Sequence, residues 1–427
     1  MSYRPILTAR IGKVDPTSLD DYVAHGGFQA LKRALALGPD AIIDIVTQAN
    51  VLGRGGAAFP AGIKWKAVST EPGPKYVVAN ADESEPGTFK DRIIMEGDPF
   101  SLVEGVIIAS YAVGAHQAYI YIRGEYPLAI TRVQNAVDAC YQAGMLGERI
   151  LDRRYPLDIE VRRGAGAYIC GEETALFESI EGKRGFPRIK PPFPTQVGLF
   201  GRPTLINNVE TLINALPLVQ HGPDWFRTMG PLDSPGPKLY CLSGRIRRPG
   251  LVEAPMGTTL YDLIYNYGGG VTGSGELGGV LLGGAAGTFV TADDLDVFMD
   301  FGSLREIDAA LGSGVVIVFD TSVDMKAVLR RIARFFAHES CGKCYPCQLG
   351  TQRQLEIIER LAADRLRPGD LQLLSEVGQT MTDASICGLG QTAHSAIRTA
   401  LKRFDFDPST GHFARFGPPS GVQEALA

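Results

Sequence analysis

The chain contains 427 residues, of which 45% are hydrophobic, so it is long and apolar enough to form two or three packed domains. Its formal net charge of −5 and the lack of a basic run exclude nucleic acid and acidic membrane surfaces as expected partners. The N-terminal residues lack the apolar core of a secretory signal, and the longest apolar stretch, from Leu102 to Ala115, is too short to span a bilayer. We therefore expect a cytoplasmic protein without direct membrane insertion.

The first half of the chain has the pattern of an α/β domain. Two helical periods come first, in GFQALKRALAL and DAIIDIVTQAN. Short apolar runs typical of strands follow, in KYVVAN, AYIYIRG and LDIEVRRG. This alternation predicts a layered α/β domain, to which we assign residues 1–236.

A glycine-rich loop follows the second predicted helix. The segment GRGGAAFPAGIKW, from Gly53 to Trp65, combines four glycines with Arg54 and Lys64. Glycine permits the positive φ and close backbone approach that a phosphate or a flavin ring requires, and the two cations add positive charge. The segment is not a Walker loop, because neither Ser nor Thr follows Lys64. On local grounds a tight structural turn explains it equally well.

An acidic turn, NADESEPGTFKDR, comes directly after the strand KYVVA. It places Asp82, Glu83 and Glu85 at the C-terminal end of a predicted strand, where carboxylates can accept hydrogen bonds from ribose hydroxyls or a nicotinamide amide. A solvated acidic turn and a magnesium site are the two other interpretations.

Two further segments have residues suited to a nucleotide. GAGAYICGEETAL, from Gly164 to Leu176, follows the strand LDIEVRR and is expected to open a helix, a context in which anions bind. It departs from the strict dinucleotide fingerprint, because Ile169 occupies the third glycine position. PTLINNVETL supplies Asn207 and Asn208, which suit either the edge of a flavin or the cap of the next helix.

The rest of the chain divides into a β-rich and a helical part. After the proline-rich MGPLDSPGPK, runs such as KLYCLSG, GGVLLGG and GVVIVFD predict a small β domain over residues 237–322. Helical periodicity returns in MKAVLRRIARFFAHES, QRQLEIIERLAAD and DLQLLSEVGQTM. Residues 323–427 are therefore predicted to form a helical domain.

Seven cysteines without an export signal favour free thiols or metal ligands over disulfides. Cys341, Cys344 and Cys347 recur at every third residue, a spacing that lets thiolates wrap one face of a cubane iron–sulfur cluster. Cys387, in SICGLG, is the candidate fourth ligand. A 4Fe-4S cluster is favoured over structural zinc, which more often uses separated C-x2-C pairs. The other three are expected to be small buried side chains: Cys140, Cys170 and Cys241.

Taken together, these motifs make the chain resemble the NADH-binding flavoprotein subunit of respiratory complex I, known in bacteria as the F subunit, and the related diaphorase subunits of soluble hydrogenases and formate dehydrogenases. The resemblance runs from LDDYVAHGGFQAL to SICGLG. It implies a Rossmann-like α/β domain that binds FMN and NADH, a ubiquitin-like β-grasp domain, and a C-terminal helical bundle with a 4Fe-4S cluster. It also implies oxidation of NADH by hydride transfer to FMN, with single electrons passed to the cluster and on to partner subunits.

The same resemblance implies the residues of the site. Glu85 takes the catalytic position, Phe59 and Phe193 would flank the adenine, and Glu173 would lie near the adenosine ribose. The cofactor-binding set it implies is Gly53, Arg54, Gly55, Gly56, Phe59, Lys64, Asn80, Asp82, Glu83, Glu85, Tyr168, Gly171, Glu172, Glu173, Lys190, Phe193, Asn207, Asn208 and Thr211. The ligands of the iron–sulfur cluster would be Cys341, Cys344, Cys347 and Cys387.

This sequence departs from the family pattern in two places. The family usually reads GRGGAGFPTG, whereas this chain has Ala58 and Ala61 in place of glycine and threonine. If position 58 needs a positive φ, its Cβ costs about 1 kcal/mol. CYPCQLG replaces the usual CTPCREG, so that Gln348 and Leu349 remove an Arg–Glu pair beside the cluster.

The resemblance also implies partners. These are a small thioredoxin-like 2Fe-2S subunit and a larger iron–sulfur subunit, in a complex whose membrane attachment leaves this chain peripheral on the cytoplasmic side. A diaphorase subunit of a soluble hydrogenase or formate dehydrogenase is the second hypothesis, although such chains often carry fused extensions that are not seen here. A non-enzymatic assembly subunit with structural zinc is the third, supported only by Ala58 and Ala61.

Overall fold

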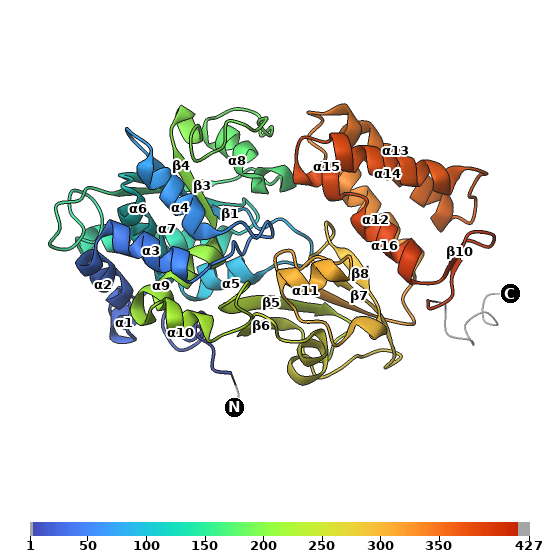
Figure 1. Cartoon of the computed structure of the whole chain (residues 1–427), viewed down its shortest axis with the longest axis horizontal. Coiled ribbons are helices and arrows are strands. Elements are labelled where there is room, and N and C mark those ends of the chain that lie inside the picture. The colour runs from blue at the N-terminus through green and yellow to red at the C-terminus, as the bar shows by residue number, and fades with distance from the viewer. Residues whose placement is uncertain (1–2, 417–427) are drawn as a thin grey trace. The chain divides into compact units, whose positions relative to one another are not determined.

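The computed structural model describes residues 3–416, which divide into two compact units (Figure 1). The first unit holds residues 3–84, 89–239 and 253–257, and the second holds the rest of the described chain. Within residues 3–416, no helix combines the length and the apolar character needed to cross a membrane.

A four-stranded parallel sheet organises the first unit. Its strands are β1 (Tyr76–Ala81), β2 (Gln117–Ile122), β3 (Asp158–Arg163) and β4 (Thr204–Asn208). They are ordered β3-β2-β1-β4, and the register aligns Asn80 of β1 with Asn208 of β4. Strands β2 and β3 are added in succession on one side of β1, whereas the last strand, β4, pairs with the other side of β1. This change of side makes the β1–β4 edge the switch point where α/β sheets bind ligands.

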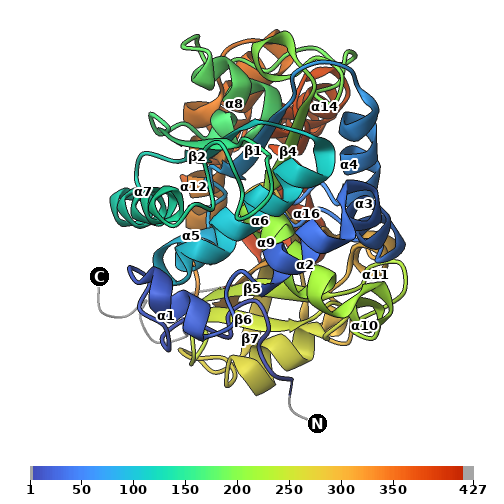
Figure 2. The same cartoon turned by 90° about the vertical axis from the view of Figure 1, so that its left-hand side faces the viewer.

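Helices cover this sheet. Five of the helices carry or contact residues of the candidate site: α4 (Ala61–Thr70), α5 (Lys90–Gly97), α6 (Pro99–Val113), α8 (Glu173–Ile180) and α9 (Val209–His221). The first unit also contains α1 (Leu19–Ala24), α2 (Gln29–Leu37), α3 (Pro39–Gln48), α7 (Pro127–Gln142) and α10 (Pro223–Arg227). Helix α6 is apolar nearly all round and packs against α9 and β1 (Figure 2). Its buried Glu104 is satisfied by the Tyr22 hydroxyl at 2.6 Å and by the backbone N–H groups of Phe28 and Leu31.

A five-stranded mixed sheet lies in the second unit, except for the first residues of β5 and the last residues of β6, which belong to the first unit. Its strands are β5 (Pro237–Gly244), β6 (Gly250–Pro255), β7 (Leu277–Leu282), β8 (Thr288–Val290) and β9 (Val315–Asp320), in the order β6-β5-β9-β7-β8. Strands β5 and β9 are parallel, whereas β7 is antiparallel to both β9 and β8. The short helix α11 (Phe301–Glu306) lies between β8 and β9 in the chain.

The C-terminal part of the second unit is helical. Its elements are α12 (Met325–Glu339), α13 (Tyr345–Ala362), α14 (Asp370–Ala384), α15 (Gly388–Thr392), α16 (Ser395–Arg403) and a short hairpin of β10 (Phe406–Asp407) and β11 (His412–Phe413). Helices α12, α13 and α14 pack in succession, and α15 contacts α13 and α14. The chain segments that carry the four clustered cysteines lie at the starts of α13 and α15.

The sequence-based elements are largely confirmed. The two helical periods are α2 and α3, and the three strand-like runs are β1, β2 and β3. The four C-terminal cysteines lie among helices α12 to α16. The segment GAGAYICGEETAL differs in detail, because a 3-10 turn over Tyr168–Gly171 precedes α8. The division into domains at residues 236 and 322 stays a prediction. The last residues of the third predicted domain, 417–427, lie outside the described residues.

Candidate functional site

The C-terminal ends of β1 and β4 bring polar side chains to the switch point of the first unit. Asn80 ends the register of β1 opposite Asn208, and Asn207 lies opposite Ala79. The Asn80 amide donates to the carbonyl of Gly171 at 2.9 Å, which joins the turn before α8 to the sheet. These predicted residues, distant in sequence, therefore meet at one edge of the sheet.

The glycine-rich loop lies against the same edge. It is closed at its base, where Gly53 N donates to Phe59 O and Ala61 N donates to Val51 O. A Cβ added at Gly55 would lie 3.2 Å from the Cβ of Asn208, so the loop backbone approaches β4 closely. Only glycine permits this approach without displacing Asn208.

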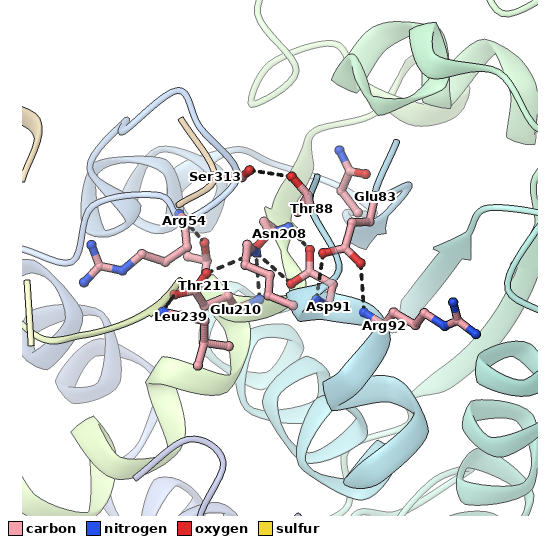
Figure 3. A network of polar contacts seen from close by, with 12 residues as sticks. Arg54, Glu83, Thr88, Asp91, Arg92, Asn208, Glu210, Thr211, Leu239 and Ser313 are labelled. Carbon is pink, nitrogen blue, oxygen red and sulfur yellow. Dashed lines mark hydrogen bonds and ion pairs between the residues drawn. The ribbon is translucent and has the colours of Figure 1, made fainter. Parts of the chain in front are cut away.

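Arg54 turns into the protein from this loop. Its side chain is fully buried, and its guanidinium donates to the Pro235 carbonyl at 2.7 Å. Its backbone N–H donates to the Thr211 hydroxyl at 2.8 Å (Figure 3). Arg54 and Thr211 were both predicted for the site. In the structure their hydrogen bond attaches the glycine-rich loop to α9.

A buried charge network underlies Asn208. The Lys90 ammonium lies 3.0 Å from the Asn208 amide oxygen and 2.7 Å from the Asp91 carboxylate, and the Asn208 amide donates to Asp91 at 2.7 Å. Lys90 also lies 3.0 Å from Glu210, which accepts a 2.7 Å hydrogen bond from Lys238. The Asn208 amide is therefore held by hydrogen bonds from groups at the starts of α5 and α9 (Figure 3).

The charges in this network shift each other's pKa values. Burial would lower the pKa of Lys90, but Asp91 and Glu210 outweigh it and raise that pKa. Burial lowers the pKa of Lys238 to about 8, although Glu210 acts against it. Burial would raise the pKa of Glu210, but the two lysines hold it below its ordinary value. Lys90 therefore stays charged and gives Asn208 a permanent hydrogen-bond donor.

The three predicted acids are placed in different ways. Glu83 accepts the backbone N–H groups of Asp91 and Arg92 at 2.8 and 2.9 Å, so it caps α5 (Figure 3). Burial, with Asp91, raises the pKa of Glu83 to about 8. Asp82 is 8% exposed and accepts from the Ser84 hydroxyl at 2.8 Å. Glu85 belongs to the second unit, where it accepts from Ala286 N at 3.0 Å.

The start of α8 carries a second acidic pair. Glu172 caps this helix by accepting the backbone N–H groups of Thr174 and Ala175. Glu173 lies between two cations, at 3.2 Å from Lys64 and 2.6 Å from Lys190. Burial would raise the pKa of Glu173, but these lysines outweigh it and lower that pKa. Glu173 is therefore ionised at neutral pH.

Two exposed phenyl rings belong to the predicted set. Phe59 is 47% and Phe193 is 53% exposed, so each ring has a face available to a ligand. The Lys64 ammonium lies 5.9 Å from the Phe59 ring centroid. Exposed rings beside ionised groups suit the stacking of a nucleobase.

Sequence reasoning missed several residues that hold the site. Lys90, Glu210 and Lys238 are fully buried, a state that their charge does not predict. Trp65 is also buried and donates from its indole to Asn207 at 2.9 Å, which orients the second amide of the pair. The one signal available was that Lys90 and Asp91 lie at the end of the segment NADESEPGTFKDR, which holds the three predicted acids.

The residues of the first unit fit a flavin phosphate and a dinucleotide. Glycine backbone at the loop, two oriented amides at the strand ends, and the partly exposed cations Lys64 and Lys190 offer donors for phosphate and for a polar ring edge. The crowding at Gly55 shows that the loop needs glycine for its path.

The four predicted cluster cysteines lie close together in the second unit. Burial raises the pKa of the Cys347 thiol to about 11, and the thiols of Cys344, Cys387 and Cys341 each add to the rise, which requires all three to be near. The Ser340 hydroxyl lies 3.3 Å from the Cys347 sulfur. Among residues 3–416, no three or more His, Cys, Asp or Glu side chains are grouped to hold a metal ion, so the ligand role of these thiols stays a prediction.

The donor set itself fits an iron–sulfur cluster. All four candidate ligands are thiols, and the loops that carry them begin helices α13 and α15, where free backbone N–H groups point outward. The remaining cysteines, Cys140, Cys170 and Cys241, are buried and form no disulfide within the described residues, as expected.

Comparison with known proteins identifies the family. Residues 46–216 match the Nuo51 FMN-binding domain, residues 238–318 match the SLBB domain, and residues 327–408 match the iron–sulfur binding region of NADH-ubiquinone oxidoreductase-F. The second of two NADH-quinone oxidoreductase F subunits of Rhizobium meliloti (strain 1021) is 46% identical over 404 residues, which are 94% of this chain and 96% of that protein. The chain belongs to the family of NADH-quinone oxidoreductase F subunits. FMN and a 4Fe-4S cluster are therefore its cofactors.

Other members and relatives match over similar lengths. The NADH-quinone oxidoreductase F subunit of Aquifex aeolicus (strain VF5) is 46% identical over 93% of this chain and 92% of its own length. The NADP-reducing hydrogenase subunit HndC of Solidesulfovibrio fructosivorans is 42% identical over 93% of this chain and 81% of its own length. A solved chain of NAD+-reducing [NiFe]-hydrogenase superposes with a TM-score of 0.82 at 38% identity, over 92% of this chain and 65% of that one. The F-subunit family and hydrogenase diaphorases thus share this fold.

Proposed function

We propose that this chain is the electron-input subunit of an NADH:quinone oxidoreductase, and that it oxidises NADH and delivers single electrons to partner subunits. The single observation that carries the proposal is the meeting, at the β1–β4 switch point, of the glycine loop with Asn80, Asn207 and Asn208 in a chain that also has four clustered thiols. Bound FMN would supply the exchange between a two-electron hydride and the single electrons that an iron–sulfur cluster accepts.

The chain's own residues position the reactants. The backbone of Gly53, Gly55 and Gly56 would hold the flavin phosphate, and the three asparagines and Gly171 would orient the ring. Lys90 holds Asn208, and Trp65 holds Asn207, so neither amide can rotate when a ligand binds. This fixed geometry is the main contribution a protein makes to hydride transfer.

The dinucleotide would bind through the second group of predicted residues. Phe59 and Phe193 would stack on the adenine, Glu173 would accept from the ribose, and Lys64 with Lys190 would balance the charge of the diphosphate. Tyr168, Glu172 and Asp82 would complete the pocket. We assign Glu85 the catalytic position on the nicotinamide side, with its carboxylate oriented by the Ala286 N–H.

The second unit would serve electron exit. Its strand order and central parallel pair, β5 with β9, support a β-grasp arrangement, which acts as a structural spacer. The helices α12 to α16 would form the bundle that carries the cluster on Cys341, Cys344, Cys347 and Cys387. The nearest partners would be a small thioredoxin-like 2Fe-2S subunit and a larger iron–sulfur subunit, and this chain would be peripheral on the cytoplasmic side of the membrane complex.

A diaphorase role in a soluble hydrogenase is the second candidate, because HndC and the hydrogenase chain match most of this sequence. The two candidates share the chemistry of NADH, FMN and 4Fe-4S and differ in the final acceptor. Isolation of the native complex decides between them: quinone reduction supports the first, and hydrogen-dependent reduction of NAD supports the second.

The test of the shared chemistry is an anaerobic absorbance spectrum before and after addition of NADH, with flavin, iron and zinc assayed on the same sample. Flavin peaks over an iron–sulfur shoulder, both bleached by NADH, are expected. Cys387→Ala should lose iron but keep NADH-bleachable flavin, whereas Cys241→Ala, in β5, should keep both. Stoichiometric zinc with no flavin would instead indicate the structural assembly subunit.

A further inference from the structure

Ser385 has a hydroxyl group that the protein itself does not use. Its backbone N–H donates to Met381 O at 3.2 Å and ends α14, and its carbonyl accepts from the Gln391 side chain at 2.9 Å. The residue is only 5% exposed, yet among the described residues its Oγ atom has no hydrogen-bond partner. Burying a hydroxyl in this way is unfavourable unless a group outside the chain accepts from it.

The position of this hydroxyl points to the cysteine cluster. A Cβ added at Gly390 would lie 2.3 Å from Ser385 Oγ and 2.9 Å from the Cβ of Cys347. The hydroxyl and the Cβ of Cys347 therefore both lie against Gly390, where a side chain at position 390 would have no room. Ser385 also precedes Cys387, the predicted fourth ligand, by two residues in the sequence.

Ser340 provides an internal comparison. Its hydroxyl lies 3.3 Å from the Cys347 sulfur, where it donates once that sulfur is a thiolate ligand. One serine thus already bonds to a ligand sulfur in the structure. The second serine lies beside Gly390, which also borders Cys347, and its hydroxyl has no partner among the described residues. Different elements supply them, since Ser340 ends α12 and Ser385 ends α14.

We propose that Ser385 donates a hydrogen bond to a sulfur atom of the iron–sulfur cluster on its Cys347 side and thereby raises the reduction potential of the cluster. The inference rests on the proposed function, because it requires the cluster to be held by these four cysteines. One-electron reduction places additional negative charge on the cluster and its sulfur atoms. A hydrogen-bond donor stabilises the more negative state more strongly, so it favours reduction. Ser385 forms and breaks no covalent bond in this role.

The experiment uses the full chain in its purified complex. The midpoint potential of the cluster is measured by EPR-monitored redox titration in the wild type and in Ser385→Ala, with iron content measured on each sample. We expect Ser385→Ala to lower the potential by an amount equal to about a three- to tenfold change in the one-electron equilibrium constant. Ser385→Thr keeps the hydroxyl and should restore most of the wild-type potential.

A spectroscopic signature separates a hydrogen bond from a merely structural role. After exchange into D2O, ENDOR of the reduced cluster should show one exchangeable deuteron fewer in Ser385→Ala than in the wild type. Thr382→Val is the matched control, because the Thr382 hydroxyl, three residues before Ser385, already donates to Gly378 O and Gln391 O. The control should change neither the potential nor the deuteron signal.

Two outcomes would overturn the inference. The first is an unchanged potential and deuteron signal in an iron-replete Ser385→Ala variant, and the second is an equal shift in Thr382→Val. If Ser385→Ala fails to assemble, Ser385→Cys replaces it: its weaker donor should give a lower potential, and an unchanged one contradicts the proposal. A wild-type protein without four iron atoms and a cluster signal would instead refute the proposed function itself.

Discussion

The ammonium group of Lys90 lies 3.0 Å from the carboxylate of Glu210, and neither side chain is exposed to solvent. The pair joins the first turn of α5, where the segment NADESEPGTFKDR ends, to the first turn of α9, which directly follows the asparagine pair. The same ammonium group holds the Asn208 amide. The geometry of the candidate flavin site therefore depends on a buried ion pair that lies next to Asn208.

Replacement of Lys90 by methionine tests this dependence. The change leaves Glu210 and Asp91 buried with one cation fewer, so the free energy of unfolding of the first unit should fall by about 3–5 kcal/mol. Urea unfolding followed by tryptophan fluorescence measures it, since both tryptophans, Trp65 and Trp225, lie in this unit. Arg92→Gln removes an exposed pair with Glu96 and should cost less than about 1 kcal/mol. Equal losses in both variants would contradict the assigned role.

The backbone at Ala58 gives a second prediction. Its φ is 54°, in the left-handed region that disfavours a Cβ, which is the condition under which the departure from the family glycine matters. Ala58→Gly should stabilise the protein by about 0.5–1 kcal/mol, because relief of strain exceeds the added entropy of the unfolded chain. Ala57→Gly, beside it and without a positive φ, should destabilise it instead. Thermal unfolding of the two variants provides the comparison, and a less stable Ala58→Gly protein would contradict the prediction.

The position of Glu173 between Lys64 and Lys190 predicts coenzyme preference. An ionised carboxylate there repels a 2′-phosphate, whereas the two lysines alone would attract one. Glu173→Gln should raise the ratio of kcat/KM for NADPH to that for NADH by roughly tenfold, which corresponds to about 1.4 kcal/mol. Glu178→Gln, on the same helix, removes an ion pair with Arg188 outside the predicted site and should leave the ratio unchanged. An unchanged ratio in Glu173→Gln would remove Glu173 from this role.

His394 predicts a pH dependence of stability in the helical part. It is 7% exposed, its Nδ1 atom lies 3.0 Å from the Gln354 amide oxygen, and burial lowers its pKa from 6.5 to about 4. Between these two pH values His394 is protonated in the unfolded chain but neutral in the folded chain. Its contribution to the free energy of unfolding is therefore fully present above pH 6.5 and is lost as the pH falls toward 4. Between pH 7.5 and 5.5 we expect a loss of about 1.4 kcal/mol.

Urea unfolding of the wild type and His394→Gln at several pH values measures this loss. The variant should be less stable at neutral pH but should depend less on pH. His338→Gln, at a side chain that is 84% exposed, should leave the pH dependence unchanged. A wild-type slope equal to that of His394→Gln would exclude His394 as its source.

The alternation of helical and strand-like runs predicts the layered first unit. The grouping of Asn80 with Asn207 and Asn208 is implied by the family resemblance alone, because no strand is predicted before Asn207. The sequence also predicts the clustering of the cysteines, because their spacing is specific. It could not predict that Lys90 and Glu210 are buried, because charged residues are ordinarily exposed and only tertiary packing pairs them. Nor could it place Ser385, whose neighbours come from helices distant in the chain.

The order of strands in the first sheet also bears on how the protein is made. Strand β4 is the last of the four in the chain, yet it pairs with β1, the first. A nascent chain that ends before Thr204 can pair β1 with β2 and β3, but it leaves one side of β1 open and lacks both Asn207 and Asn208. An open apolar edge of this kind attracts other strands, so this stage of synthesis is the one most in need of a chaperone. The position of one strand thus sets the earliest moment at which the ribosome can yield a flavin-binding chain.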